Sequence, residues 1–406
     1  MMLGYLLARA GIEVLVLEKH ADFLRDFRGD TVHPSTLELM HELGVLEDLL
    51  RLPHQRVSKV RGRIGGDEVV LADMACLRTR CKFMALMPQW HLLNFLAEQG
   101  SRYPTFHLNM QTEVTALIEE GGRIAGIRAN TPDGSAEVRA DLVVAADGRN
   151  SVLRERAGLT VEDVGAPVDV LWMRLSKYRD DPELFVYANR GRALVLLDRD
   201  EYWQCGLTIP KEAASEMQAK SIEELRATIV ENAPFLCNRV GEVRDWSDVK
   251  LLTVRVDRLQ RWYRPGLVCI GDAAHAMSPV GGVGVNLAIQ DAVAAANILA
   301  EPLRKGAVST RHLARIQRRR EFPARFTQRV QSVIRRQISG DPNHSGYRQL
   351  PWPVRLLEST TLPRRMRTRF VSVGIRPEHV RTPDVFKVSS FERRSSTVVP
   401  AKQGEK

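Results

Sequence analysis

Residues 266–291 read GLVCIGDAAHAMSPVGGVGVNLAIQD, and this stretch sets the architecture of the chain. The apolar residues 267–270 predict a buried strand, which Gly271 ends. Residues 285–300 are small and apolar, and they predict a helix that packs on a sheet. Three glycines open that helix: Gly281, Gly282 and Gly284. A strand, a glycine turn and a helix N-terminus predict an anion-binding site, because backbone N–H groups and the helix dipole both favour a negative group placed there.

The ordered pattern G-D-A-A-H-x-x-x-P-x-x-G-x-G-x-N in this stretch is similar to the second flavin-binding motif of single-component flavoprotein aromatic hydroxylases, the p-hydroxybenzoate hydroxylase family. The resemblance implies that Asp272 hydrogen-bonds the ribityl chain of FAD and that Pro279 lies beside the reacting face of the flavin. It places the pyrimidine end of the ring against the loop residues Gly282, Gly284, Val285 and Asn286. His275 is expected to be a structural hydrogen-bonding residue rather than a general base.

The N-terminal residues predict a helix, a turn and a strand. Residues 1–9 are rich in small and apolar residues, Gly11 ends the helix, and residues 13–18 form an apolar strand that ends on Glu18. This order is typical of the second half of a dinucleotide-binding βαβ unit, in which the acid takes the ribose hydroxyls of the adenosine. No strand and no G-x-G-x-x-G precede this helix in the sequence. Because the resembling family carries the FAD pyrophosphate on that first strand and loop, we expect the natural polypeptide to begin upstream of Met1.

Three further positions match the cofactor-binding residues of the resembling family. Arg28 stands in the loop after the ribose acid, where the family carries an arginine near the mobile flavin. Gln89 begins a predicted helix after Pro88, beside the expected flavin side chain. Asp147 opens the pattern D-G-x-x-S-x-x-R, which resembles the family's middle motif near the pyrophosphate; a helix cap is the simpler role for this residue. A capping box at residues 35–38 predicts a short helix that ends at Gly44.

The middle of the chain predicts antiparallel sheet. Residues 112–139 predict a three-stranded meander, and residues 165–209 alternate apolar and polar side chains as in a sheet with one covered face. We expect a further strand at residues 249–256. The resemblance implies a substrate pocket between this sheet and the flavin, for which the candidate lining residues are Trp172, Tyr187 and Trp203. Each of these aromatic residues could equally be plain core.

The predicted fold class is α/β: a Rossmann-like, three-layer FAD-binding domain without its first strand, with an inserted antiparallel substrate domain and a helical C-terminal region. The FAD-binding domain is discontinuous and takes residues 1–160 and 260–300. The substrate domain takes residues 161–259, with a contribution from residues 57–87. Residues 301–388 form the basic helical region, which Pro323 is expected to break, and the polar residues 389–406 predict a disordered tail.

Composition narrows the class of protein. The five cysteines show no paired spacing among 406 residues, which predicts reduced thiols and a cytoplasmic location. No uninterrupted apolar run reaches the length of a membrane span. Residues 301–370 hold 17 Lys and Arg against 4 Asp and Glu, so they carry the whole positive surplus of the chain. A solvated helix face is the simplest interpretation, a membrane-surface contact is a second, and no nucleic-acid motif accompanies the arginines.

The resemblance implies an FAD-dependent monooxygenase that uses NADH or NADPH and O2 to hydroxylate an aromatic or polyketide-like small molecule through a flavin C4a-hydroperoxide. The sequence names no catalytic base and no metal site. Three alternatives stay open: a reductase of the geranylgeranyl reductase type, a non-catalytic remnant that binds no FAD, and a membrane-peripheral enzyme. The substrate, the choice between NADH and NADPH and the oligomeric state are not encoded in any pattern that we can interpret.

Overall fold

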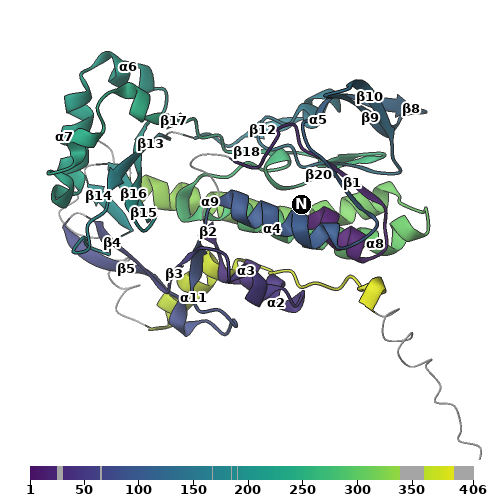
Figure 1. The fold of residues 1–406 in the computed structure, drawn as a ribbon, viewed down its shortest axis with the longest axis horizontal. Helices are drawn as coiled ribbons and strands as arrows, with labels where there is room; N and C mark the ends of the chain where they lie inside the picture. Colours follow the sequence, from purple (N-terminus) through teal and green to yellow (C-terminus); the bar gives the residue numbers. More distant parts are fainter. Residues whose placement is uncertain are drawn as a thin grey trace, which may run out of the picture.

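The computed structural model describes residues 1–24, 31–64, 66–166, 168–183, 185–189, 191–338 and 361–387. Long helices run through the middle of the molecule, with small sheets on one side of them (Figure 1). A larger sheet and two helices form one end of the molecule (Figure 1). The fold is therefore of mixed α/β class. Arg28 and the predicted tail at residues 389–406 lie outside the described residues.

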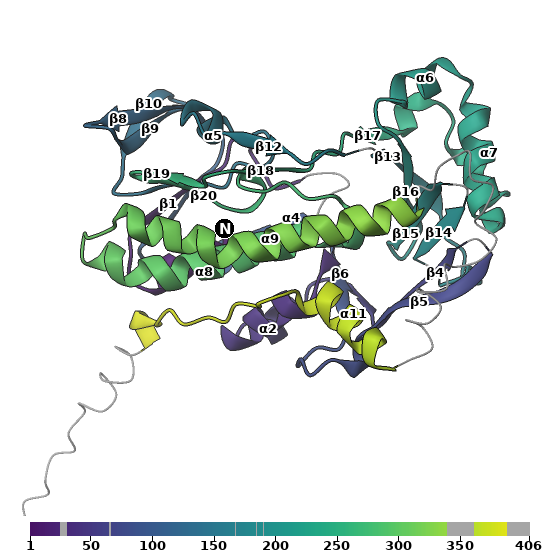
Figure 2. The ribbon, with the colours of Figure 1, turned by 180° about the vertical axis from the view of Figure 1, so that it is seen from behind.

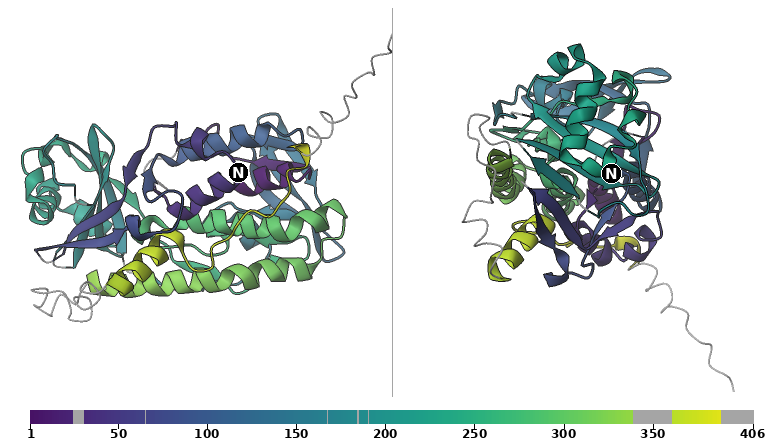
Figure 3. Two further views of the ribbon diagram at one scale, coloured as in Figure 1. Left: turned by 90° about the horizontal axis from the view of Figure 1, so that it is seen from below. Right: turned by 90° about the vertical axis from the view of Figure 1, so that its left-hand side faces the viewer.

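The N-terminal helix and strand form as the sequence predicts. Helix α1 spans Met2–Arg9, Gly11 follows it with φ +76°, and strand β1 spans Val14–Leu17. A Cβ atom at Gly4 would lie only 2.7 Å from the Val16 side chain, so a glycine is needed where the helix crosses the strand. Four helices then lie side by side in the order α4 (Gln89–Ser101), α1, α8 (Gly284–Arg304) and α9 (Thr310–Ile338) (Figure 3).

Two small sheets each contain a parallel pair of strands. Strand β1 pairs in parallel with β7 (Phe106–Asn109). Strand β11 (Val143–Ala145) pairs in parallel with β20 (Leu267–Cys269), whose other neighbour is the short antiparallel β19 (Tyr263–Arg264). The predicted meander is present as β8 (Glu113–Glu120), β9 (Arg123–Thr131) and β10 (Gly134–Arg139).

A seven-stranded sheet forms one end of the molecule, in the order β17-β13-β16-β15-β14-β4-β5. Its strands are β17 (Lys250–Leu252), β13 (Val168–Ser176), β16 (Tyr202–Pro210), β15 (Arg192–Asp198), β14 (Val186–Asn189), β4 (Lys59–Ile64) and β5 (Asp67–Asp73). All neighbours are antiparallel except β14 and β4. Helices α6 (Ala214–Ala219) and α7 (Ile222–Asn232) cover its outer face (Figure 1). The strand predicted at residues 249–256 is much shorter, because only residues 250–252 find a partner, on β13.

Shorter elements join these parts. They are α2 (Pro34–Glu42), α3 (Leu46–Leu49), α4 (Gln89–Ser101), α5 (Val152–Arg156), β2 (Thr31–Val32), β3 (Gln55–Val57), β6 (Met84–Leu86), β12 (Val161–Asp163) and β18 (Asp257–Leu259). Helix α2 corrects the predicted capping box: it begins one residue before Ser35, at Pro34, and its N-cap is His33 without a side-chain bond. Proline is suited to the first helical position, where its missing N–H costs nothing. Gly44 has φ +74° just beyond the helix, as predicted.

Helix α8 (Gly284–Arg304) is the central helix of the molecule, and it packs against both α1 and α9. By length and composition alone the segment Val280–Arg304 could cross a membrane, with a mean hydropathy of 1.4. Because 67% of its most apolar window is buried inside the fold, the segment is accounted for as a core helix.

Helix α9 (Thr310–Ile338) runs through Pro323, so the predicted break at that residue is wrong. Figure 2 shows α9 as one long helix beside α8, with α11 (Thr361–Val373) below it. Residues 374–384 are neither helix nor strand, although they lie within the predicted basic helical region 301–388. All five cysteines are free thiols, as predicted.

Candidate active site

The glycine turn before α8 adopts backbone angles that side chains avoid. Gly271, Gly281 and Gly282 have φ values of +59°, +80° and +60°. At Gly282 a Cβ atom would lie 2.1 Å from the Thr31 Oγ1 atom, and the Thr31 hydroxyl donates to the Gly282 carbonyl at 2.9 Å. The turn is therefore held against β2, which lies about 250 residues away in the sequence.

The first turn of α8 leaves room for a ligand. Helical geometry gives the backbone N–H groups of Gly284, Val285 and Asn286 no acceptor inside the helix. A Cβ atom at Gly284 would meet nothing nearer than the Met277 Cβ atom at 3.9 Å and the Asp272 Oδ1 atom at 4.0 Å. Open N–H donors, a bare glycine and a half-buried carboxylate fit the polar edge of a flavin and the hydroxyls of its ribityl chain.

The Asn286 side chain is committed to the protein itself. Its Oδ1 atom accepts from the His33 backbone N–H at 2.9 Å and from the Thr36 hydroxyl at 2.8 Å. Its Nδ2 atom donates to the Thr31 carbonyl at 3.0 Å and to the Gly282 carbonyl at 3.1 Å. Asn286 therefore joins α8, β2 and α2, and only its backbone N–H is left to face a cofactor.

A buried ionic cluster lies behind the glycine turn. The Asp291 carboxylate accepts from the Gly271 backbone N–H at 3.0 Å, and it lies 2.6 Å from His275 Nε2 and 2.8 Å from Arg320 Nε. All three side chains are 1% exposed. Burial opposes ionisation of Asp291, but the neighbouring His275 and Arg320 outweigh it and hold the pKa of the carboxyl below its ordinary value. His275 is thus placed as a structural residue, and the carboxylate fixes the turn from α8.

The middle motif meets the same turn. Ser151 caps α5 by accepting from the Arg154 backbone N–H at 3.0 Å, while Asp147 Oδ2 accepts from the Leu153 backbone N–H at 3.2 Å. Arg154 is buried, and its Nη1 and Nη2 atoms donate to the two carboxylate oxygens of Asp257, each at 3.1 Å. Its Nη1 atom also approaches the Ala273 carbonyl at 3.5 Å, which brings the two sequence motifs together.

The remaining predicted cofactor residues sit on other elements. Glu18 follows β1, and its Oε1 atom accepts from the His20 backbone N–H at 3.0 Å. Burial lowers the pKa of the Met1 amino group, and the Glu18 carboxylate partly offsets this effect. Gln89 is the half-buried first residue of α4. Pro279 is exposed at the start of the glycine turn.

The three aromatic candidates for the substrate pocket do not face one space. Tyr187 and Trp203 belong to the core under α7, where the Tyr187 ring packs 5.7 Å from the Phe235 ring and Trp203 Nε1 donates to Asp181 at 2.7 Å. Trp172 lies on the opposite face of the sheet, over Gly206, with Val254 and Val256. Successive residues of a strand point to opposite faces of its sheet, and these three side chains are divided between the two faces, so a shared pocket for all three is excluded.

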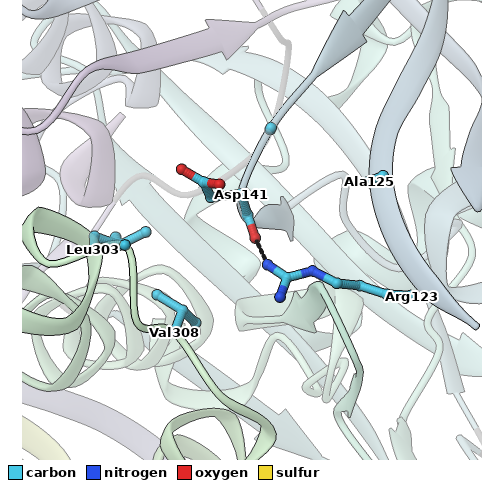
Figure 4. A pocket seen from close by; sticks show the side chains of 7 residues that line it. Arg123, Ala125, Asp141, Leu303 and Val308 are labelled. Carbon is cyan, nitrogen blue, oxygen red and sulfur yellow. Dashed lines mark hydrogen bonds between the residues drawn. The ribbon is translucent and has the colours of Figure 1, made fainter. Parts of the chain in front are cut away.

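Two hollows in the described residues bear on the location of the flavin. One, of about 220 Å³, lies at the far end of α8 between Arg123, Asp141, Leu303 and Val308 (Figure 4). Since α8 rises about 1.5 Å per residue, this hollow is nearly a whole helix length from Gly284. A smaller apolar cavity of about 70 Å³ lies behind the glycine turn, between Val280, Leu287 and Phe370. The larger hollow is therefore not the expected flavin site.

Comparison with known proteins assigns the family. A family model described as "FAD binding domain" matches residues 1–330. The 6-methylpretetramide 4-monooxygenase of Streptomyces rimosus is 32% identical over 338 residues, which cover 83% of this chain and 81% of that protein. This chain belongs to the family of FAD-dependent aromatic monooxygenases. It is therefore a flavoprotein that uses FAD, as the glycine turn indicated.

Other relatives of this FAD-dependent monooxygenase agree. Para-nitrophenol 4-monooxygenase of Pseudomonas sp. (strain WBC-3) is 25% identical over 327 residues, or 78% of this chain and 79% of that protein. The crystal structure of P. aeruginosa PqsL in complex with 2-aminobenzoylacetate has a TM-score of 0.72 at 23% identity and covers 91% of this chain and 95% of that one. The second likeness concerns the fold alone.

The sequence interpretation missed the residues that support the turn from behind. Asp291 ended the quoted stretch without a role, and Arg320 was counted only as part of a basic run. A lone Asp among apolar residues in the first half of a core helix is the signal that could have identified it, since buried carboxylates require partners.

Proposed function

We propose that this monooxygenase uses NADH or NADPH and O2 to hydroxylate a polycyclic aromatic compound of polyketide type. The observation that carries the proposal is the similarity, over four fifths of both chains, to an enzyme named for a 6-methylpretetramide substrate. The glycine turn and the unpaired backbone N–H groups at the start of α8 support it, because these features suit the ring of a bound flavin and not a second dinucleotide-binding site.

We assign the cofactor to the unit formed by residues 1–160 and 260–300, in a Rossmann-like arrangement. The N–H groups at the start of α8 would hold the pyrimidine edge, and Asp272 would take the ribityl hydroxyls. Glu18, at the end of β1, would take the adenosine ribose, and Asp147 would lie on the pyrophosphate side. Arg28 and Gln89 stay in the proposal as flavin neighbours on the strength of their positions in the sequence.

We assign the substrate to the inner face of the seven-stranded sheet, formed by residues 161–259 with strands from residues 57–87. That face carries Trp172, Leu197, Val254 and Val256, while α7 covers the other. Since Tyr187 and Trp203 are packed under α7, Trp172 is the aromatic candidate that we retain for substrate contact. An apolar wall of this kind orients a planar ring and excludes water from the reacting carbon.

The chain's own residues bind, orient and exclude water. Bound FAD, once reduced by a nicotinamide, supplies the activation of O2 that inserts one oxygen atom into the ring. The dipole of α8 and its free N–H groups favour negative charge at the pyrimidine edge, and Asp291 holds the turn that presents them. A cytoplasmic location and the absence of a fixed general base remain predictions.

The test is a coupled assay with 6-methylpretetramide and para-nitrophenol as probe substrates. We expect oxidation of NADH or NADPH, O2 uptake and hydroxylated product in equal amounts with the polycyclic probe. Catalase measures any uncoupled hydrogen peroxide. Product formed without O2 would replace the monooxygenase with a reductase, and a purified chain without a flavin absorption band after FAD addition would indicate a non-catalytic remnant.

A further inference from the structure

The exposed face of α9 is a line of arginines. From residue 311 to residue 333, every exposed residue of the helix recurs at a spacing of three or four, so all of them share one face. We call five of them the arginine face: Arg311, Arg315, Arg318, Arg325 and Arg329. The remaining two are Phe322 and Val333. At about 1.5 Å per residue the arginine face is about 27 Å long.

In the part of the chain that the structure describes, four of these five arginines have no structural partner. Within the described ranges, Arg311, Arg315, Arg318 and Arg329 take part in no ion pair and no hydrogen bond, and only Arg325 pairs, with Glu321 at 3.2 Å. The inner side of the same helix differs, because Arg319 and Arg320 pair with Glu378. Among the described residues, α9 thus pairs Arg319 and Arg320 with a carboxylate and leaves a row of guanidinium groups on the arginine face for an external anion.

Apolar side chains are interleaved with this charge. Phe322 is 46% exposed and Val333 is 55% exposed in line with the arginines. The Phe326 and Phe370 rings meet edge to face at 5.0 Å and join α9 to α11, where Met366 is 67% exposed. Figure 2 shows α9 along one side of the molecule with α11 beside it.

We propose that the arginine face binds an anionic lipid surface. Guanidinium groups pair with lipid phosphates in bidentate geometry, and exposed Phe and Val side chains enter the boundary between headgroups and acyl chains. No arginine of this face lines either of the two hollows described above, and the face offers charge together with exposed apolar side chains. A flat bilayer matches a straight row of this kind. The proposal does not depend on the identity of the substrate.

Vesicle flotation of the full chain tests the proposal. Vesicles of phosphatidylcholine alone are compared with vesicles that also contain phosphatidylglycerol, at low and at high salt. We expect binding only to the anionic vesicles and loss of binding at high salt, because surface charges are screened. Each arginine near an anionic surface contributes on the order of 1 kcal/mol, so replacing Arg311, Arg318, Arg325 and Arg329 by Gln should lower the partition coefficient by about 100-fold or more.

The matched control removes the same charge elsewhere. Arg51, Arg102, Arg128 and Arg139 are all more than half exposed and form surface ion pairs. Replacing these four by Gln should lower partition by less than about fivefold, because none of them belongs to the arginine face. Thermal unfolding of both variants checks that each is folded. F322S should weaken binding without changing its salt dependence.

Three outcomes would overturn the proposal. They are equal losses in the two quadruple variants, absence of wild-type flotation with anionic vesicles at low salt, and binding to an acidic protein in place of vesicles.

Discussion

At the scale of single residues, Asn286 does more for the fold than for direct cofactor contact. Its side chain makes four hydrogen bonds, to His33, Thr36, Thr31 and Gly282. N286A would leave buried donors and acceptors without partners, which costs about 1–3 kcal/mol for each unsatisfied group. We expect the free energy of unfolding to fall by at least about 3 kcal/mol and FAD binding to weaken with it.

Denaturant unfolding and flavin titration measure these two effects. N297A is the matched control on the same helix, since Asn297 bonds His379 and Arg381 at the surface. It should cost less than about 1 kcal/mol. Equal costs for the two variants would contradict the joining role of Asn286.

His33 predicts a specific dependence of stability on pH. Burial lowers the pKa of this imidazole from 6.5 to about 4, with its Nδ1 atom 3.0 Å from the Val371 carbonyl. Between pH 6.5 and about pH 4, the His33 imidazole is protonated in the unfolded chain and neutral in the folded protein. The free energy of unfolding therefore falls as the pH falls. At pH 5 the loss from this residue is about 2 kcal/mol, and it reaches about 3 kcal/mol near pH 4.

The measurement is urea unfolding of wild type and H33Q at neutral pH and at about pH 5. H33Q should lose less stability on acidification, by about 2 kcal/mol. If the two proteins lose stability in parallel, the imidazole is not held neutral in the folded state.

Sequence motifs predicted the local backbone geometry of the site, but they did not predict which residues from distant parts of the sequence hold it in place. The glycines of the turn were placed correctly from the sequence because their backbone needs are local. Thr31, which fits against Gly282, lies on a strand that no local pattern could pair with the turn. The ion pair between Arg320 and Asp291 could not be predicted either, because a contact between residues 29 positions apart depends on how α8 and α9 pack.

At the scale of elements, two glycines near the start of α8 have different roles: Gly282 shapes the backbone turn, and Gly284 leaves space for the cofactor. Gly282 has φ +60° and no room for a Cβ atom, whereas Gly284 has ordinary backbone angles and open space around it. G284A should keep or raise the stability of the FAD-free protein, by up to about 1 kcal/mol, because alanine favours the helix. It should raise the Kd for FAD about tenfold or more, since the methyl group would occupy the space left for the flavin.

G282A is the comparison, and it should destabilise the FAD-free protein by about 2–4 kcal/mol through strain and overlap with Thr31. Thermal unfolding without FAD and fluorescence titration with FAD separate the two effects. An unchanged FAD affinity in G284A would move the flavin away from this helix end.

Elements also show where sequence rules gave way to packing. Pro323 predicted a break, yet α9 continues through it because contacts fix the helix on both sides of the proline. Before the proline, Arg320 forms an ion pair with Asp291. After it, the side chains of Gln328 and Gln331 donate to backbone carbonyls of residues 276–280. In contrast, the meander and the alternating strands were predicted well, since their period of two persists over long segments.

At the scale of the whole molecule, residues 376–386 tie together helices that are far apart in the sequence. Glu378 pairs with Arg319 and Arg320, and Glu42 accepts from the Val380 backbone N–H. Asp384 lies 3.4 Å from Arg9 and accepts from the Tyr103 hydroxyl at 3.1 Å. This segment therefore connects α9, α2, α1 and the residues just after α4, in a region that the sequence predicted to be helical.

Removal of residues 374–406 should therefore destabilise the whole fold. Arg320 is 1% exposed and would lose one of its carboxylate partners, and unpairing a buried ion costs about 3–5 kcal/mol. We expect the free energy of unfolding to fall by at least about 4 kcal/mol and the flavin to be lost, because Arg320 also holds Asp291 behind the glycine turn. Removal of residues 388–406 alone is the control, and it should cost much less. If the longer truncation fails to fold, E378Q with D384N tests the same contacts in the full chain. Equal stability of the two truncated proteins would show that the segment only covers the surface.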